Sequence, residues 1–175
     1  MIKHLPKDKY EQYAIDFKYE TNGYYDVKII ENNHSMAFRL NYKSYEKPLK
    51  KAFVDHLYES HNENAKAYGY FVQNELAGLV EVNFEEWNKR LRITELIVFE
   101  AYKRHGIGTI LMNYAKEKAE ANQARMMILE TQTCNIPAIR FYQAYGFKLV
   151  GIDTSCYSNK DIETKEVRIE LGYYL

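Results

Sequence analysis

The sequence predicts a single α+β domain over residues 1–175, with a mixed, mostly antiparallel central sheet flanked by helices. Three observations support this fold class. An apolar strand at residues 92–99 runs into two glycines and an amphipathic helix, and a second strand-to-helix unit follows at residues 126–147. The last residues, 165–175, alternate apolar and polar side chains, which is typical of a closing antiparallel strand.

The first half of the chain is expected to supply two helices and two hairpins. Apolar residues at helical spacing predict a short helix over residues 10–17 and a second helix over residues 48–57. The predicted strands and turns are residues 24–30 and 35–41 around the turn 31–34, and residues 68–72 and 76–84 joined across Asn74 and Glu75.

The glycine loop indicates an anion-binding site. A helix start has backbone N–H groups without intrahelical partners, and Gly106 and Gly108 let a ligand approach them because neither carries a Cβ. Lys103, Arg104 and His105 add donors where phosphates would lie. An ordinary strand-to-helix turn with basic side chains is the alternative interpretation, because a lone Gly-x-Gly is weak evidence.

The second strand-to-helix unit has both of its helix ends marked. Asn135 suits an N-cap, Pro137 suits the first turn and Gly146 suits the C-terminal cap. The predicted apolar face comprises Ala138, Phe141, Tyr142 and Tyr145.

Together the two units resemble the Gcn5-related N-acetyltransferase (GNAT) superfamily. Its first motif is a strand ending in Leu/Ile-x-Val and then Arg/Gln-x-x-Gly-x-Gly/Ala, matched by Leu96-Ile-Val98 and by Lys103 to Gly108. Its second motif, Asn-x-x-Ala-x-x-Phe-Tyr-x-x-x-Gly-Phe, is matched from Asn135 to Phe147. Lys103 stands where the family usually has Arg or Gln, so a donor is kept but the planar fork is lost.

The resemblance implies a GNAT fold with acetyl-CoA in a cleft at splayed central strands, and direct attack of an amine on the thioester. Tyr142 matches the family tyrosine that protonates the departing thiolate. The base is expected to be Glu130, which a buried strand would perturb, with Glu95 and Glu81 as the alternatives; each can instead be a structural carboxylate. The implied cofactor-binding residues are Leu96, Ile97, Val98, Lys103, Arg104, His105, Gly106, Ile107, Gly108, Thr109, Asn135, Ala138 and Tyr142.

Finer features resemble the streptothricin acetyltransferases, which acetylate an amine of a cationic antibiotic. The similar segments are Trp87-Asn88, residues 129–132, residues 153–157 and the aromatic C-terminal strand. A cationic small-molecule amine would be held by carboxylates and aromatic rings, for which we name Glu81, Glu85, Glu86, Trp87, Asp153 and Tyr157. A protein N-acetyltransferase and a non-catalytic acyl-CoA-binding module are the alternatives.

The composition limits the classes of partner and the compartment that we expect for the protein. Lys plus Arg equals Asp plus Glu at 24 each, so no basic field favours nucleic acid. Two cysteines, Cys134 and Cys156, without clustered histidines predict neither a disulfide framework nor a metal site, and favour a reducing cytoplasm. No apolar window predicts a signal peptide or a membrane span, and a homodimer is left open.

Overall fold

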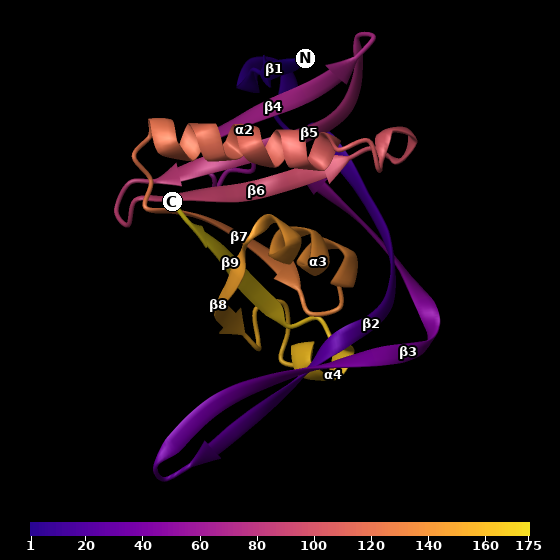
Figure 1. The fold of residues 1–175 in the computed structure, drawn as a ribbon, viewed down its shortest axis with the longest axis vertical. Helices are drawn as coiled ribbons and strands as arrows, with labels where there is room; N and C mark the ends of the chain where they lie inside the picture. Colours follow the sequence, from indigo (N-terminus) through magenta and orange to yellow (C-terminus); the bar gives the residue numbers. More distant parts are fainter. The chain divides into compact units, whose positions relative to one another are not determined.

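The computed structural model describes all 175 residues, which form two compact units. The first unit comprises Met1–Phe17, Phe53–Leu129 and Gly172–Leu175; the second comprises Lys18–Ala52 and Glu130–Leu171. Hydrogen bonds order the strands as β1-β4-β5-β6-β7-β9-β8, with β2 and β3 forming a separate two-stranded ribbon (Figure 1). Each unit is described by itself below.

The first unit contains most of the sheet. Its antiparallel part pairs β1 with β4, β4 with β5 and β5 with β6, whereas β6 pairs in parallel with β7. The predicted mixed sheet is therefore confirmed. The elements are β1 (Ile2–Leu5), α1 (Lys7–Tyr10), β4 (Ala65–Val72), β5 (Glu75–Glu85), β6 (Arg90–Val98), η1 (Glu100–Tyr102), α2 (Ile107–Ala121) and the start of β7 (Met126–Gln132).

Apolar side chains from the first two segments of this unit form a core cluster. The cluster comprises Leu5, Ile15, Leu57, Tyr58, Ala67 and Leu79. Leu111, Met112 and Ala115 of α2 are fully buried, as one face of an amphipathic helix requires, whereas Ile110 is exposed. The strand that leads into the glycine loop is thus fixed by a packed helix and a packed sheet.

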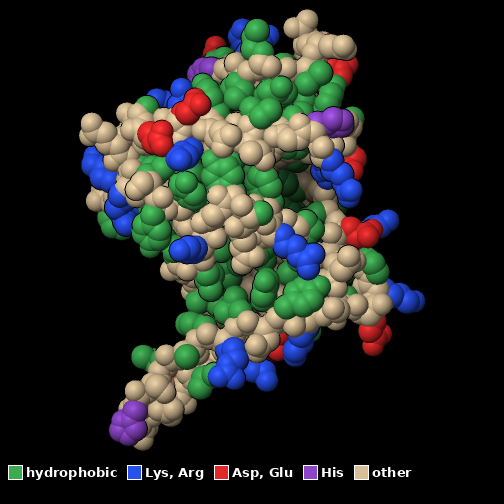
Figure 2. Space-filling model, in the orientation of Figure 1, with side chains coloured by type: hydrophobic (Ala, Val, Ile, Leu, Met, Phe, Trp, Pro, Cys, Tyr) green, Lys and Arg blue, Asp and Glu red, His purple; other side chains and the backbone are tan.

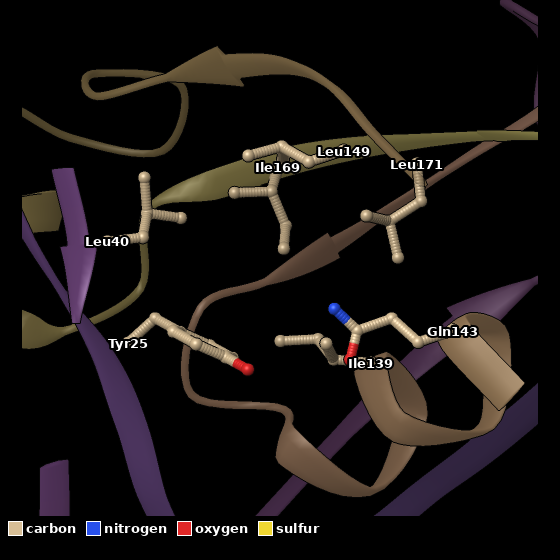
Figure 3. A pocket seen from close by; sticks show the side chains of 7 residues that line it. All are labelled: Tyr25, Leu40, Ile139, Gln143, Leu149, Ile169 and Leu171. Carbon is tan, nitrogen blue, oxygen red and sulfur yellow. The ribbon is translucent and has the colours of Figure 1, made fainter. Parts of the chain in front are cut away.

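The second unit contains the ribbon and the C-terminal elements: α3 (Ile136–Tyr145), β8 (Lys148–Asp153), α4 (Asp161–Thr164) and most of β9 (Arg168–Tyr174). An apolar pocket within this unit is lined by Tyr25, Leu40, Ile139, Gln143, Leu149, Ile169 and Leu171 (Figure 3). None of these residues is a predicted site residue, and the lining offers no cationic side chain for a phosphate. We therefore do not assign the pocket to the cofactor.

Two predicted helices are wrong, because the ribbon replaces both. β2 spans Ala14–Asn32 and β3 spans Ser35–His56, so the second half of residues 10–17 and nearly all of residues 48–57 are strand, while Tyr10 ends the short helix α1. Apolar residues three or four apart favoured a helix, but pairing with a long neighbouring strand overrode that local preference. Pro48 is tolerated because each strand of an isolated ribbon has an unpaired edge. The ribbon's turn falls at the predicted place, where the Asn32 side chain accepts the N–H groups of His34 and Ser35 at 2.9 and 3.0 Å.

The predicted strands 24–30 and 35–41 exist but are much longer than expected, since β2 begins ten residues earlier and β3 ends 15 residues later. The predicted elements from residue 68 onward are confirmed with small shifts in their ends. The β4–β5 hairpin turns at Gln73 and Asn74, both with positive φ (48° and 69°), as a tight hairpin requires. The longest helix has 15 residues, and no helix has the length and apolar character needed to span a membrane.

Candidate functional site

The start of α2 has unused backbone donors. Gly106 precedes the helix with φ +76°, a left-handed conformation that favours glycine, and no side chain caps the helix. The first N–H with an acceptor inside the helix is that of Ile110, which donates to the Gly106 carbonyl at 3.1 Å. The N–H groups of Ile107, Gly108 and Thr109 therefore lack intrahelical partners at the positive end of the helix dipole. This arrangement suits a phosphate.

The basic side chains beside this helix start lie at the surface. Lys103 pairs with Glu100 at 2.6 Å, and the His105 ring lies 3.3 Å from the Tyr102 carbonyl oxygen. Arg104 adopts φ 65°. Ile107 is buried and anchors the loop. Backbone groups are therefore the fixed donors of this cradle, and the exposed cations supplement them.

β6 loses one neighbour part of the way along its length. Its parallel ladder with β7 has four residue pairs and ends at Ile93 and Leu129, whereas β6 continues to Val98. Beyond Ile93 only β5 pairs with β6, and Leu96, Ile97 and Val98 lie opposite Val80, Leu79 and Gly78. This part of β6 has a second edge whose backbone groups are available to an extended ligand.

Two carboxylates face each other across β5 and β6. Glu81 and Glu95 are register partners, and the ladder shifts beside them, leaving Thr94 as the extra residue of a bulge. Glu81 is 1% exposed, and its two oxygens accept hydrogen bonds from the Tyr58 N–H (2.7 Å) and the Thr94 hydroxyl (2.8 Å). Burial raises the pKa of Glu81 despite these donors.

Glu95 is perturbed more strongly. Burial, together with the nearby carboxylates of Asp55, Glu81 and Glu59, raises the pKa of Glu95 to about 9. A carboxylate with this pKa is a much stronger base than an ordinary one, and it approaches a lysine-like amine at about 10.4. Among the predicted bases, Glu95 therefore has the environment that best suits proton transfer from an ammonium.

Asp55 and Glu59 were missed from the sequence because residues 48–57 were read as a helix. As the end of a strand and the turn after it, they bring two carboxylates to Glu95. Asp55, His56 and Glu59 have donor atoms within 4.8 Å of one another, a spacing that acidic groups commonly adopt without an ion, and we assign no metal to them. The run Phe53-Val-Asp-His-Leu57 does not alternate apolar and polar residues, so the sequence carries no strand signal at this point.

The second unit holds the second motif. Asn135 caps α3 by accepting the Ala138 N–H at 3.3 Å, and Gly146 ends the helix with φ 116°, so both predicted caps are confirmed. Tyr142 is half-buried and packs edge-on against Phe141, with ring centroids 5.6 Å apart. Ile136 and Ile139 are the fully buried residues of α3, so the predicted aromatic face is only partly buried.

The expected burial of Glu130 is wrong. Residues 126–129 of β7 are buried, but the strand emerges at Glu130, whose side chain is 40% exposed. Arg168 holds it at 2.6 Å and also contacts Glu170 at 3.1 Å. The argument that burial would perturb this carboxylate therefore does not apply.

Of the residues expected to bind the acceptor, Glu81, Glu85, Glu86 and Trp87 lie in the first unit, whereas Asp153 and Tyr157 lie in the second. Glu81 lies in the carboxylate cluster, whereas Trp87, 85% exposed, lies in the turn after β5, where the Arg90 guanidinium covers its ring at 5.9 Å. Four residues of strand, roughly 13 Å, separate Glu81 from the start of that turn. Asp153 and Tyr157 are exposed in the second unit, where Asp153 accepts the Ser155 N–H at 3.0 Å.

Cys134 has the properties of a structural residue. It is fully buried, burial raises the pKa of its thiol, and its sulfur lies 3.6 Å from the Tyr19 hydroxyl. A raised pKa disfavours the thiolate that a nucleophile requires. The geometry agrees with a mechanism that has no covalent enzyme intermediate.

Similarity to proteins of known sequence provides independent evidence for the family of this chain. A streptothricin acetyltransferase of Escherichia coli is 33% identical over 113 residues, which cover 65% of this chain and 63% of that protein. The chain thus spans less than two thirds of that relative. An N-alpha-acetyltransferase of Sulfurisphaera tokodaii is 30% identical over 146 residues, covering 77% of this chain and 81% of that protein.

Solved structures show the same fold over nearly the whole chain. A crystal structure of nourseothricin acetyltransferase matches with a TM-score of 0.78 at 24% identity, covering 99% of this chain and 97% of that one. A Bacillus anthracis structure in complex with acetyl coenzyme A matches with a TM-score of 0.76 at 22% identity, covering 100% and 97%. The family model for the acetyltransferase (GNAT) family matches residues 30–147, which include both motifs, and the chain belongs to that family.

Proposed function

We propose that the protein is an acetyl-CoA-dependent N-acetyltransferase that acts on a primary amine of a small cationic molecule of the streptothricin type. The observation that carries the proposal is the uncapped start of α2 directly after the free edge of β6, in a chain of the GNAT family. The complex with acetyl coenzyme A among its structural neighbours supports the cofactor. The similarity to streptothricin acetyltransferases supports the acceptor class.

The cofactor is proposed to bind in an extended form along β6, with its pyrophosphate at α2. Leu96, Ile97 and Val98 would offer backbone groups to the pantetheine arm. Gly106, Ile107, Gly108 and Thr109 would offer N–H groups to the phosphates, with Lys103, Arg104 and His105 around them. Asn135, Ala138 and Tyr142 are proposed cofactor residues on the strength of the family motif.

The chemistry is a direct transfer. The acceptor ammonium gives one proton to Glu95, and the neutral nitrogen attacks the thioester carbon. The tetrahedral intermediate loses a second N–H proton to bulk water, the carbon–sulfur bond breaks, and Tyr142 protonates the departing thiolate and takes a proton back from water. Glu130 is the second candidate for the base. Glu81, Trp87, Asp153 and Tyr157 are proposed acceptor residues, with Glu81 favoured by its place beside Glu95. No metal is part of this scheme.

The test is acetyl transfer by the purified protein. Thiol release from acetyl-CoA and mass spectrometry should show acetylated streptothricin, whereas aminoglycosides should remain unmodified. Tyr142→Phe should lower turnover by about 10²-fold with little change in acetyl-CoA affinity. Gly108→Glu should abolish acetyl-CoA binding in calorimetry, because its charge would repel the phosphates. Folded protein that binds acetyl-CoA but acetylates no amine would be a binding module and would refute the proposal.

Acetylation of a peptide N-terminus is the second candidate function. It is favoured by the 30% identity to an N-alpha-acetyltransferase over 77% of the chain. The same assay separates the two functions, since a peptide panel should give no thiol release if the acceptor is a small cationic amine. Efficient acetylation of peptides, without acetylated streptothricin, would replace the first candidate with this one.

We also propose that the enzyme works in the reducing cytoplasm, with Cys134 and Cys156 as thiols.

We further propose that two copies of the chain associate through the ribbon. The ribbon exposes Ile29, Met36 and Phe38 at 51%, 80% and 50%, and Figure 2 shows apolar side chains along it. Light scattering should give a dimer for the wild type and a monomer for the double variant M36K/F38K. A monomeric wild type at micromolar concentration would contradict the dimer.

A further inference from the structure

One face of the ribbon is apolar toward its turn. The rings of Tyr25 on β2 and Tyr42 on β3 contact each other with their centroids 6.0 Å apart, so these two side chains share a face. Side chains two positions apart on a strand point to the same face. Continued toward the turn, this face therefore carries the apolar side chains Val27 and Ile29 of β2, and Leu40, Phe38 and Met36 of β3.

The ribbon's own unit covers only the inner part of this face. Val27 is buried, and Tyr25 and Leu40 line the apolar pocket together with residues of α3, β8 and β9 (Figure 3). The tip residues, by which we mean Ile29, Met36 and Phe38, are each exposed by half or more. A two-stranded hairpin without a packed face is marginally stable at best in water. The outer part of the ribbon therefore needs a partner that covers the tip residues.

The pocket can receive one side chain from outside. Its volume is about 100 Å³, and its lining is apolar except for the Tyr25 hydroxyl and the Gln143 amide. An apolar cavity of about 150 Å³ holds a benzene ring, so a slimmer, unbranched side chain fits here. Leu149 belongs to the lining and is half exposed, so the pocket opens to the surface. Methionine suits such a pocket, because its flexible thioether adapts to irregular gaps.

Buried area decides between two ways in which two copies can meet. A large side chain such as Phe buries roughly 150–250 Å² when it is fully covered, so the tip residues of two copies packed against each other bury about 700 Å² at most. Stable interfaces bury about 1,200–2,000 Å² in total. Contact between the two tips alone therefore falls short, whereas each tip placed on a second apolar surface buries that surface as well.

We propose that the ribbon tip of one copy docks on the second unit of the other copy, with Met36 in the pocket and Phe38 against Leu149, and that the reciprocal contact completes a symmetric dimer. This inference rests on the association through the ribbon proposed above and names the surface that receives the ribbon. Two such contacts bury about 1,200 Å² or more, because each adds the lining and rim of the pocket to the area of the tip. A two-fold axis relates the two contacts, as in most soluble homodimers.

Leu149→Lys tests the receiving surface, because it would place an ammonium group against the apolar tip. The dissociation constant of the dimer, measured by analytical ultracentrifugation, should rise by about tenfold or more. Val54→Lys is the matched control: Val54 is 55% exposed on β3 but belongs to the first unit, so the dissociation constant should stay near that of the wild type. A Leu149→Lys dimer as tight as the wild type would overturn the docking and leave association through the ribbon in place. A monomeric wild type would overturn both, while thiol release from acetyl-CoA by the same sample tests the proposed enzyme separately.

A disulfide between copies tests the contact without a disruptive variant. One preparation carries Met36→Cys and a second, nitrogen-15-labelled preparation carries Leu149→Cys, both with Cys156→Ser so that the buried Cys134 is the remaining native thiol. After mixing and mild oxidation with diamide, mass spectrometry should show a disulfide that joins one labelled and one unlabelled chain. Disulfides formed only between two Met36→Cys chains would place the tips against each other and overturn the docking. The absence of any disulfide from a dimeric sample would overturn it as well.

Discussion

The turn end and the middle of the β5–β6 strand pair differ in the partners and the pKa of their carboxylates. At the turn end, Glu85 is held by the Arg90 and Arg92 side chains at 2.9 and 2.6 Å, and its pKa is lowered by hydrogen bonds that outweigh burial. In the middle of the pair, Glu81 and Glu95 face each other without a cation, and burial raises the pKa of both. The same two strands thus carry a satisfied structural carboxylate and a destabilised pair. Glu95 therefore lacks a cationic partner within the chain, and we expect a ligand to supply the positive charge.

Glu95→Gln should have the largest effect on activity. Gln keeps the shape but cannot accept a proton, so kcat/KM for acetyl transfer should fall by about 10²- to 10⁴-fold. Acetyl-CoA affinity, measured by calorimetry, should change little. A variant with nearly full activity would show that Glu95 is no more functional than Glu85.

The same variant should be more stable than the wild type at high pH. The pKa of Glu95 is raised in the folded state to about 9 from the ordinary 4.5, so the folded protein binds more protons than the unfolded chain between these values. The free energy of unfolding of the wild type should therefore fall as pH rises through this window. Gln is neutral throughout, so urea unfolding of Glu95→Gln at pH 5, 7 and 9 should show a weaker fall. Parallel pH profiles would contradict the assigned cause.

Glu85→Gln should behave in the opposite manner. Loss of the two charge-assisted hydrogen bonds to Arg90 and Arg92 should lower the free energy of unfolding by about 2 kcal/mol, while kcat/KM stays close to the wild-type value. Urea unfolding and the thiol-release assay measure the two effects. A large loss of turnover without loss of stability would place a functional carboxylate at this end as well.

Glu130→Gln should give the smallest change. Its partner Arg168 contacts it at the surface, and exposed ion pairs contribute about 1 kcal/mol or less. Turnover should fall far less than in Glu95→Gln. Equal losses in the two variants would restore Glu130 as a candidate for the base of equal standing.

The glycine loop and the second helix could be predicted from sequence because each is encoded locally. Gly106 takes a positive φ at the helix start, and Asn135 and Gly146 cap α3 as their residue types favour. The tip of the ribbon was predicted, but its extension to residues 14 and 56 was not, since that part depends on pairing between residues far apart in sequence. Reading residues 48–57 as a helix concealed Asp55, and the exposure of Glu130 depends on where β7 leaves the core. The order of the two candidate bases was therefore reversed once their surroundings were known.

The pH dependence of kcat/KM, measured for wild-type protein and Glu95→Gln with streptothricin and saturating acetyl-CoA, tests the central claim most directly. In the wild type kcat/KM should rise with pH through the ionisation of Glu95 and of the acceptor amine, and Glu95→Gln should lose the first contribution while the second remains. Superimposable profiles of equal height would contradict Glu95 as the proton acceptor.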